Sequence, residues 1–257
     1  MPTTRADAAL DQPLDRALAV LTALAEAARP ASITEIAAQC GLPVTTVHRL
    51  AAQLEKRNLV KRVLGTKKLI VGAALVHLGV AAAQAALRSD RIHQILVALA
   101  AELGEPCQIG VRVENEIVYV DTARAARSAG LHFDQGKHAP LQCTSIGKLF
   151  LAEMVDPDFE WWLHNADLAK FTPATIVSRP KLRSVVNEVR RCGWATSNEE
   201  FVPGVVGCAV PIRLDDARLL AGLGLAVPSA RTPFAKLKGF IPVLKAAARQ
   251  IAAASGD

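Results

Sequence analysis

The sequence predicts two domains of different architecture: an N-terminal helical domain that ends in a β-hairpin, and a C-terminal α+β domain with an antiparallel sheet. Helical apolar spacing with start and stop signals fills the first part of the chain, and two short β-prone runs around a glycine follow it. After residue 90, amphipathic helical segments alternate with hairpin-like strand pairs. We place the domains at residues 1–72 and 90–257, with a linker helix over residues 73–89.

The residues before Gly41 predict two helices. In PLDRALAVLTALAEAARP the apolar positions 14, 17, 18, 21, 24 and 25 recur at a helical period, and Pro30 ends the helix. Ser32, followed three residues later by Glu35, is the capping-box pattern of a second helix. Gly41 provides the left-handed conformation that ends this helix, and Pro43 suits the first turn of a third helix.

The third helix is amphipathic, and its two faces differ in chemistry. Two helices joined by a short glycine-containing turn form a helix-turn-helix pattern. The apolar face would pack on the first two helices and consists of Val44, Val47, Leu50, Ala51 and Leu54. The other face and its flanks carry short polar or cationic side chains, namely Thr45, Thr46, His48, Arg49, Gln53 and Lys56.

A β-hairpin is expected directly after the third helix. The runs LVKRV and KLIV are β-prone and flank Gly65, a natural turn residue. A hairpin in this place is a wing, so the N-terminal domain is predicted to be a winged helix-turn-helix. The wing carries four cations: Lys61, Arg62, Lys67 and Lys68.

The charge distribution points to a polyanionic partner. The chain has a net charge of +6, and residues 30–72 hold seven Lys/Arg against two acidic residues, whereas residues 90–257 hold 19 against 18. A clustered excess suggests a polyanionic partner, but charge alone fits a solvated charged face equally well. The capping box, the glycine turn, the polar face of the third helix and the basic wing together favour double-stranded DNA over an ordinary helical hairpin. Threonine and arginine can contact base edges, and wing lysines can contact phosphates. The predicted DNA-binding residues are Ser32, Thr34, Thr45, Thr46, His48, Arg49, Gln53, Lys61, Arg62, Lys67 and Lys68.

The segment from Leu69 to Leu87 has no charged residue over a length close to that of a membrane span. It is rich in alanine, which is only weakly apolar, and it contains His77 and Gln84. A helix buried against a partner fits better, and we interpret Ala73 to Leu87 as a linker and dimer contact. Five cysteines without a CxxC spacing predict buried thiols in a reducing cytoplasm, and the N-terminus has no signal-peptide pattern.

The C-terminal domain is predicted to mix helices with hairpins. The expected helices are DRIHQILVALAAELG, TSIGKLFLAEM from near Thr144, RPKLRSVVNEVRRCG ended by Gly193, and a last helix from about Pro233 to Ala254. The expected strands are CQIGVRV, EIVYVDTA, AGLHF, GCAVPIRL and LLAGLGLAVP.

Several stretches together resemble one family. LDRALAVLTAL and SITEIAAQCGLPVTTVHRLAAQLEKRNLV are similar to the winged-helix domain of the IclR (isocitrate lyase regulator) family of bacterial transcription regulators. PLQCTSIGKLFLAE, CGWATSNEE, and PGVVGCAVPI with LAGLGLAVPS resemble the second domain of that family. The resemblance runs from about Leu14 to Ala253, and the order and spacing of the motifs make it specific.

The resemblance implies a homodimer or homotetramer and an effector-binding domain related to the GAF/PAS sheet fold. It also implies a small-molecule pocket between the sheet and the CTSIGK segment. The candidate effector-binding residues, carried over by position, are Leu131, Cys143, Ser145, Ile146, Ser197, Asn198, Gly207, Gly224 and Ala226.

The chain departs from this family at four of the pocket positions. Members that bind small carboxylates tend to have an acid, a cysteine and two serines where this chain has Ser197, Gly207, Gly224 and Ala226. Fewer hydrogen-bonding groups and more room predict a bulkier, less polar ligand, such as an aromatic acid or a derivative of one.

Enzymatic and metal-binding interpretations have less support. His138 and Cys143 could form a nucleophilic pair, or a metal site with His132, but nothing in the sequence orients the histidine and the spacing matches no zinc signature. Glu199 and Glu200 would point to opposite faces of a strand, so we expect one of them to order the pocket loop instead. The sequence therefore predicts no catalytic residues, no metal and no cofactor.

Taken together, these patterns predict a cytoplasmic, ligand-responsive, sequence-specific DNA-binding transcription regulator of a catabolic operon, associated with the nucleoid when bound to DNA. Each subunit would read half of a near-palindromic operator. The ligand would shift the population between dimer geometries and so change the spacing of the recognition helices. The alternative is a small-molecule enzyme with a winged helix for protein contacts, and it lacks a converging acid/base or nucleophile set.

Overall fold

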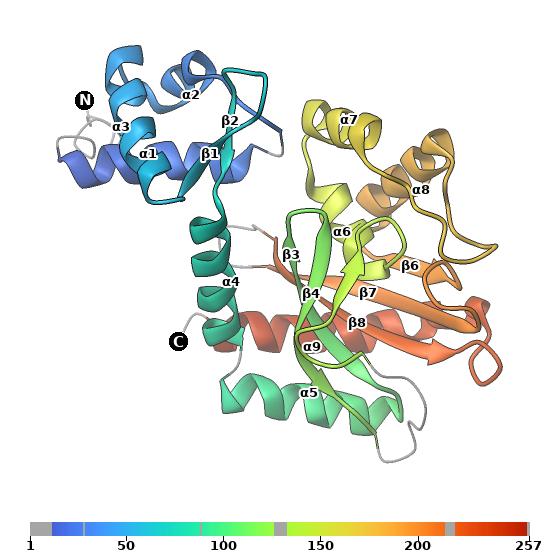
Figure 1. Ribbon diagram of the computed structural model, residues 1–257. Helices are drawn as coiled ribbons and strands as arrows, with labels where there is room; N and C mark the ends of the chain where they lie inside the picture. Colours follow the sequence, from blue (N-terminus) through green and yellow to red (C-terminus); the bar gives the residue numbers. More distant parts are fainter. Residues whose placement is uncertain (1–11, 28, 88, 126–132, 214–218, 256–257) are drawn as a thin grey trace, which may run out of the picture. The chain divides into compact units, whose positions relative to one another are not determined.

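The computed structural model describes residues 12–27, 29–87, 89–125, 133–213 and 219–255 (Figure 1). The chain divides into two compact units, and the division falls after Ala81, inside the Ala-rich helix. The first unit contains α1 (Pro13–Glu26), α2 (Ile33–Cys40), α3 (Val44–Lys56) and the hairpin of β1 (Val60–Arg62) and β2 (Leu69–Val71). This order of elements confirms the predicted winged helix-turn-helix.

The ends of α2 follow from its local sequence. The Ser32 hydroxyl accepts a hydrogen bond from the Glu35 backbone N–H at 3.2 Å, and the Glu35 carboxylate accepts one from the Ser32 N–H at 2.7 Å, which confirms the capping box. Gly41 ends the helix at φ 66°, as predicted. Pro43 lies one position earlier than predicted, at the N-cap of α3, because its ψ of 139° is not helical.

The wing is a two-stranded antiparallel hairpin in which Val60 lies opposite Val71. Its turn includes Gly65 at φ 75°, as expected for the turn residue. On its other edge, Leu69 exchanges two backbone hydrogen bonds with Ala31, at 2.8 and 3.0 Å. Ala31, which precedes the N-cap residue of α2, therefore pairs with the base of the wing.

The apolar face predicted for α1 is partly wrong. Leu14 and Leu18 are 67% and 52% exposed, whereas Val20, Ala23 and Leu24 are buried. The helix is thus rotated so that the stripe around Val20 contacts α2, α3 and the wing, and the two leucines at its start lie outside this contact. In α3, four of the five predicted core residues are buried, but Val44 at the first position is 49% exposed.

The Ala-rich helix α4 runs from Ala73 to Leu87. It starts directly after Gly72, where a Cβ atom would lie 2.1 Å from the Asn58 carbonyl oxygen, so only glycine fits there. The Ala74 N–H donates to the same oxygen at 3.0 Å. Within the described part of the chain, no helix is long and apolar enough to cross a membrane.

The second unit is an α+β fold around one antiparallel sheet with the strand order β5-β4-β3-β8-β7-β6. The elements, in chain order, are α5 (Asp90–Leu103), β3 (Cys107–Val113), β4 (Glu116–Ala123), β5 (His138–Pro140), α6 (Ser145–Glu153), α7 (Asp156–Asn165), α8 (Arg179–Cys192), β6 (Ala195–Asn198), β7 (Val205–Arg213), β8 (Leu219–Pro228), the 3₁₀-helix η1 (Phe234–Phe240) and α9 (Ile241–Ser255).

Three of these elements were not predicted: β5, α7 and β6. The first and last are edge strands of three and four residues, too short to show a period of two. The last helix begins as a 3₁₀-helix, and α9 proper starts only at Ile241. The predicted strand AGLHF falls almost entirely on residues outside the described part.

The two faces of the sheet have different coverings (Figure 1). One face carries large aliphatic side chains, such as Ile109 and Leu223, which pack with α5 and α9 into the main core. The opposite face carries Gly110, Gly222 and Gly224, and a Cβ atom at any of them would approach Ile146 of α6 within 3.3 Å. The glycines therefore allow the start of α6 to lie directly on the sheet, and this contact positions the pocket described below.

Candidate functional site

The exposed face of α3 is polar and cationic. Thr45, His48, Arg49 and Gln53 are exposed, and Thr46 is half-buried. The first turn of the helix contains no acidic residue. This leaves the partial positive charge of the helix N-terminus uncompensated, which favours an anionic partner.

The two candidate residues at the start of α2 differ in their availability. Thr34 is exposed, whereas Ser32 is occupied as the N-cap acceptor. The Ser32 backbone N–H, the Ser32 side chain and the Arg29 guanidinium together lower the pKa of Glu35 to about 2. The Ser32 hydroxyl can still donate its own proton to a phosphate, because it serves only as an acceptor in the cap.

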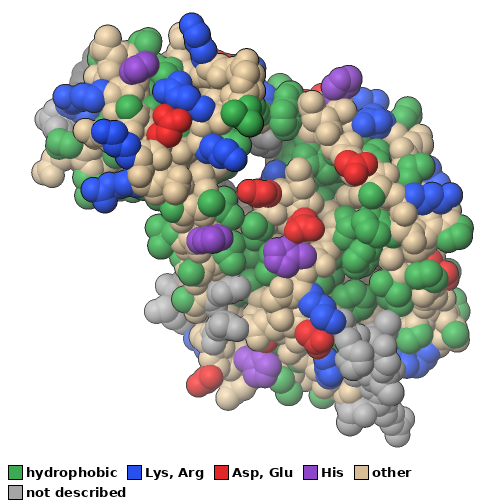
Figure 2. All heavy atoms as spheres, viewed as in Figure 1, with side chains coloured by type: hydrophobic (Ala, Val, Ile, Leu, Met, Phe, Trp, Pro, Cys, Tyr) green, Lys and Arg blue, Asp and Glu red, His purple; other side chains and the backbone are tan. Residues whose placement is uncertain are grey.

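The wing cations also differ from one another. Lys61, Lys67 and Lys68 are exposed, and no ion pair within the described chain neutralises them. Arg62, in contrast, donates to Glu55 of α3 at 3.1 Å and ties the wing to that helix. Figure 2 shows basic side chains spread over this unit with few acidic ones among them. The wing therefore offers three positive charges that the described residues leave unpaired.

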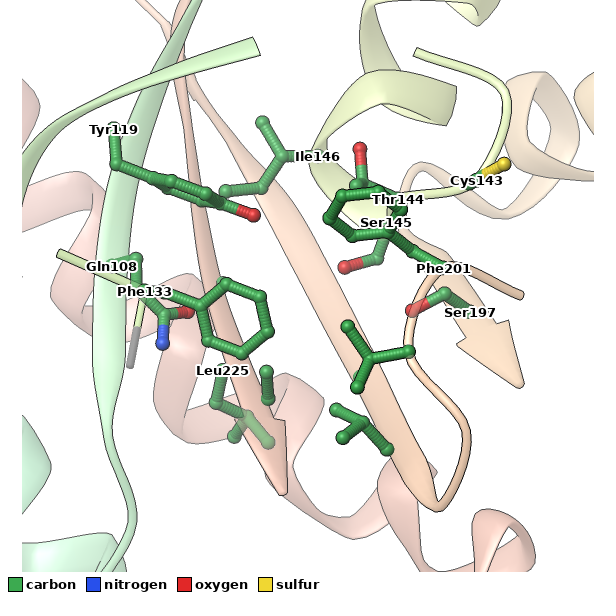
Figure 3. A pocket seen from close by; sticks show the side chains of 15 residues that line it. Gln108, Tyr119, Phe133, Cys143, Thr144, Ser145, Ile146, Ser197, Phe201 and Leu225 are labelled. Carbon is green, nitrogen blue, oxygen red and sulfur yellow. The ribbon is translucent and has the colours of Figure 1, made fainter. Parts of the chain in front are cut away.

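A pocket in the second unit lies between the glycine-bearing sheet face and the N-terminus of α6 (Figure 3). Its cavity volume is about 40 Å³, which is room for about three water molecules. The lining residues are Gln108, Tyr119, Phe133, Cys143, Thr144, Ser145, Ile146, Ser197, Phe201, Val202, Val205, Gly207, Gly224, Leu225 and Ala226.

Hydroxyl groups from different elements converge on this pocket. Figure 3 shows the hydroxyls of Tyr119, Ser145 and Ser197 pointing into the same space. Burial raises the pKa of Tyr119, which keeps its phenol protonated and able to donate. Thr144 caps α6 by accepting from the Gly147 N–H at 3.0 Å. The pocket thus combines neutral hydrogen-bond donors with a helix N-terminus, an arrangement that suits an anionic group such as a carboxylate.

A buried ion pair links two segments that contribute lining residues to the pocket. Lys148, which is only 1% exposed, donates to Glu200 at 2.5 Å and to the Thr196 carbonyl oxygen at 2.9 Å. The Asn198 N–H donates to the same Glu200 oxygen at 3.1 Å. Burial lowers the pKa of Lys148, and the Glu200 charge opposes that shift. Because Lys148 belongs to α6 and Glu200 follows β6, the pair joins the helix that carries Ser145 to the segment that carries Ser197 and Phe201.

The two adjacent glutamates do not lie on a strand, because β6 ends at Asn198. Glu199 has φ 56° and accepts from the Gly204 N–H at 3.0 Å, while Glu200 points inward to Lys148. Thr172 and Thr175 donate to the carbonyl oxygens of the two glutamates at 2.7 Å each. The loop after β6 is thus ordered by several polar contacts.

The predicted pocket residues fall into three groups. Seven of them line the pocket: Cys143, Ser145, Ile146, Ser197, Gly207, Gly224 and Ala226. Asn198 is exposed and does not line it, and Leu131 lies outside the described residues. Eight further lining residues were not predicted: Gln108, Tyr119, Phe133, Thr144, Phe201, Val202, Val205 and Leu225. Gln108 interrupts an apolar strand and Tyr119 is the single tyrosine of the chain, and both were available signals.

The expectation that the glycines enlarge the pocket is wrong for Gly224. A Cβ atom there would lie 3.2 Å from a side-chain carbon of Ile146, so the freed space is filled by α6 and not by ligand volume. At Gly207, a Cβ atom would lie 2.8 Å from the Leu225 carbonyl oxygen and 3.2 Å from the Ser197 hydroxyl. The glycines thus serve close packing.

The possible catalytic groups have other roles in the structure. His138 is paired with Glu116 at 2.7 Å on the exposed edge of the sheet, so a carboxylate does orient it, contrary to our expectation. Burial, reinforced by Glu200, raises the pKa of Cys143 to about 12, which keeps the thiol protonated and a poor nucleophile. Within the described ranges, no group of three or more His, Cys, Asp and Glu residues could hold a metal ion.

Comparison with known proteins identifies both units. Residues 13–64 match the family model of the IclR helix-turn-helix domain, and residues 82–253 match that of the bacterial transcriptional regulator IclR C-terminal domain. The chain is 30% identical over 236 residues to the probable transcriptional regulator SauR of Cupriavidus necator, and the match covers 92% of this chain and 94% of that protein. It is 26% identical over 247 residues to the transcriptional repressor IclR of Escherichia coli, covering 95% and 90% of the two chains.

Solved structures agree in fold. The IclR protein of Thermotoga maritima superposes with a TM-score of 0.61 at 24% identity, covering 95% of this chain and 98% of that one. An IclR homologue from Microbacterium hydrocarbonoxydans, solved in complex with 4-hydroxybenzoate, gives a TM-score of 0.58 at 20% identity and covers 93% and 99%. The matched relatives are regulators and give no support to the enzyme alternative. The chain belongs to the IclR family of bacterial transcriptional regulators.

Proposed function

We propose that this regulator reads its operator with α3 and holds the DNA backbone with the wing. In this proposal, Thr45, Thr46, His48, Arg49 and Gln53 contact base edges or the adjacent phosphates in the major groove. Ser32 and Thr34 donate to a phosphate from the start of α2, and Lys61, Lys67 and Lys68 lie along the backbone. Arg62 acts partly through Glu55, since their ion pair orients the wing on α3.

The single observation that carries this proposal is the exposed polar face of α3, whose first turn has no acidic residue, beside three wing lysines that the described chain leaves unpaired. Each lysine that neutralises a phosphate releases counterions, so affinity should fall steeply with salt. Arg49 is the strongest candidate for sequence readout, because a guanidinium can bond guanine in a bidentate manner.

Binding to the DNA directly upstream of its own gene tests the DNA proposal. Fluorescence anisotropy at two salt concentrations, with Arg49→Ala beside the wild type, should show tight, salt-dependent binding that the substitution weakens by roughly one to two orders of magnitude. Gln39→Ala, an exposed position of α2 outside the proposed contacts, is the matched control. Equal binding of Arg49→Ala and the control would refute the role of α3.

For the second unit, we propose that the pocket binds a small organic acid with an aromatic ring. The carboxylate would lie at the α6 N-terminus with the hydroxyls of Ser145 and Ser197, and the ring would lie beside Tyr119 and Phe133 after the Phe201 ring has moved aside. Among the described residues, no lysine or arginine lines the pocket, so neutral donors would hold the charge. The Microbacterium homologue, solved with 4-hydroxybenzoate, supports an aromatic acid as a ligand class within this fold.

The pocket is too small for such a ligand unless a lining side chain moves. A benzoate-sized molecule exceeds about 40 Å³, so the Phe133 or Phe201 ring has to move as it enters. Phe133 contacts Tyr119 edge-to-face at 5.7 Å, and Phe201 contacts Phe171 at 5.2 Å. Calorimetry with 4-hydroxybenzoate against glyoxylate and pyruvate tests the ligand class. Tight binding of only the small keto acids would contradict the aromatic assignment.

We also propose that the protein acts as a homodimer or homotetramer on a near-palindromic operator in the bacterial cytoplasm, with α4 as the linker and a subunit contact. The domain limits 1–72, 73–89 and 90–257 correspond to this division of roles. Light scattering of the purified protein, free and bound to operator DNA, measures the number of subunits. A monomer on a half-site would contradict this part of the proposal.

A further inference from the structure

The wing carries an apolar side chain at its tip that the cationic contacts do not explain. Leu64 is 95% exposed, the highest value among the large apolar side chains exposed in the described chain. It has no packing role within its own unit, because its side chain is almost fully in solvent. Full exposure of a leucine is unfavourable by itself, and covering the side chain with a partner is favourable.

The turn that presents Leu64 is ordered by its own hydrogen bonds. The Thr66 N–H and hydroxyl both donate to the Val63 carbonyl oxygen at 3.1 Å. The Lys68 N–H donates to the Thr66 hydroxyl at 3.2 Å, and the Val63 N–H donates to the Lys68 carbonyl oxygen at 3.0 Å. Together with Gly65 in the left-handed region, these bonds hold Leu64 at the tip before any partner arrives.

The charges beside Leu64 define the partner that could cover it. Residues 59–72 contain four cations and no acidic residue. Lys67 and Lys68 follow the tip, and both are exposed and unpaired within the described chain. A partner that suits both the leucine and the lysines has negative charges beside an apolar surface. Double-stranded DNA has both, because its stacked bases lie between two phosphate backbones.

We propose that Leu64 enters the DNA minor groove next to the base pairs read by α3 and contacts or partly unstacks one base step. Apolar wedges in the minor groove unstack bases and bend the duplex, and flexible pyrimidine–purine steps deform most easily. The wing would thus add sequence preference through DNA deformability, beyond its phosphate contacts. This inference rests on the proposed DNA-binding function. It assigns a role to Leu64, which is not among the proposed major-groove or phosphate contacts, and base unstacking measures that role separately from DNA affinity.

The test uses the full-length protein and the upstream DNA of its own gene, once footprinting has defined the protected site. Adenines flanking the major-groove half-site are replaced one at a time by 2-aminopurine, whose fluorescence rises on unstacking. The variants are Leu64→Ala, Leu64→Met and Lys67→Ala. Because Leu64 lies outside the core, Leu64→Ala should melt at the wild-type temperature, which a thermal scan verifies.

The wild type should increase 2-aminopurine fluorescence at one or two steps beside the half-site. Leu64→Ala should abolish this increase and weaken binding roughly tenfold per wing, with an unchanged salt dependence. Leu64→Met should retain both properties. Lys67→Ala should lower the slope of log K against log salt by about 1 and keep the fluorescence increase.

Two failures are distinguishable. If the wild type does not bind the DNA selectively, the proposed function itself fails, and this inference with it. If the wild type binds but Leu64→Ala has the same affinity and the same fluorescence signal, DNA binding stands and the role of Leu64 is refuted. An apolar tip that serves a protein partner would give this second outcome.

Discussion

Replacing Lys148 by methionine should destabilise the C-terminal unit more than any exposed substitution. Methionine keeps most of the volume of the lysine stem but removes both hydrogen bonds of the ammonium, to Glu200 and to the Thr196 carbonyl oxygen. Glu200 would then remain buried with one bond from the Asn198 N–H, and its second carboxylate oxygen has no partner within the described chain even in the intact structure. Breaking a buried pair in this way costs about 3–5 kcal/mol.

Urea unfolding followed by tryptophan fluorescence measures this loss, since Trp194 packs against the main core of the unit. Lys236→Met, at an exposed position of η1, is the matched control and should change the free energy of unfolding by less than about 0.5 kcal/mol. In the double variant Lys148→Met/Glu200→Gln, no buried charge remains and the glutamine can still accept from Asn198. We expect it to recover about 2 kcal/mol relative to Lys148→Met.

Two results would refute this reasoning. If Lys148→Met lost less than about 1 kcal/mol of the free energy of unfolding, water would have to reach Glu200 in solution and solvate its carboxylate. A double variant that is less stable than Lys148→Met alone would mean that the glutamate contributes through something other than its charge.

Three further predictions concern packing, pH and ligand access. Gly147→Ala should destabilise the protein by about 2–3 kcal/mol in the same assay, because the new Cβ atom would lie 2.2 Å from the Leu141 carbonyl oxygen. Glu35 has a pKa lowered to about 2. Its contribution to the free energy of unfolding is therefore complete above its ordinary pKa, and it is lost as the pH falls from about 4.5 toward 2. The melting-temperature difference between wild type and Glu35→Gln should shrink over this pH range. The loss of stability in Glu35→Gln is at most about 1 kcal/mol, because the carboxylate is exposed. A difference that does not change with pH would contradict the role of Glu35 in the cap. Phe201→Ala should bind 4-hydroxybenzoate severalfold more tightly by calorimetry, because the ligand no longer displaces the ring; weaker binding would identify the ring as a contact instead.

The N-terminal unit could be predicted nearly in full because its signals are local. The Ser32–Glu35 box, Gly41 and Gly65 each fix a helix end or a turn through residues within three or four positions. The same reasoning failed for the side of α1 that is buried, since Leu14 and Leu18 are as apolar as Val20. Which stripe packs inward depends on where α2, α3 and the wing lie, and this is not a local property.

The pocket illustrates the opposite case. Its position between the sheet and α6 could be expected from the family resemblance, but the partner of Lys148 lies 52 residues away and no local pattern connects the two. A lysine buried to 1% exposure is also contrary to the usual preference of that residue for the surface. Likewise, Gly224 was interpreted as extra pocket volume, because the sequence does not reveal that the Ile146 side chain fills the space beside it.

The first turn of α6 gives each of its four residues a different task, because successive residues in a helix point about 100° apart. Ser145 faces the pocket, Ile146 covers the glycines of the sheet, Gly147 packs against the backbone of Leu141, and Lys148 reaches Glu200. A ligand that bonds Ser145 therefore acts on a turn whose other three sides are already fixed. In the proposed complex, we expect the displacement that the ligand causes to appear in the phenylalanine rings of the pocket, or to pass through Glu200 to the loop after β6. The ion pair thus connects the turn that carries Ser145 to the loop after β6, which carries the lining residue Phe201.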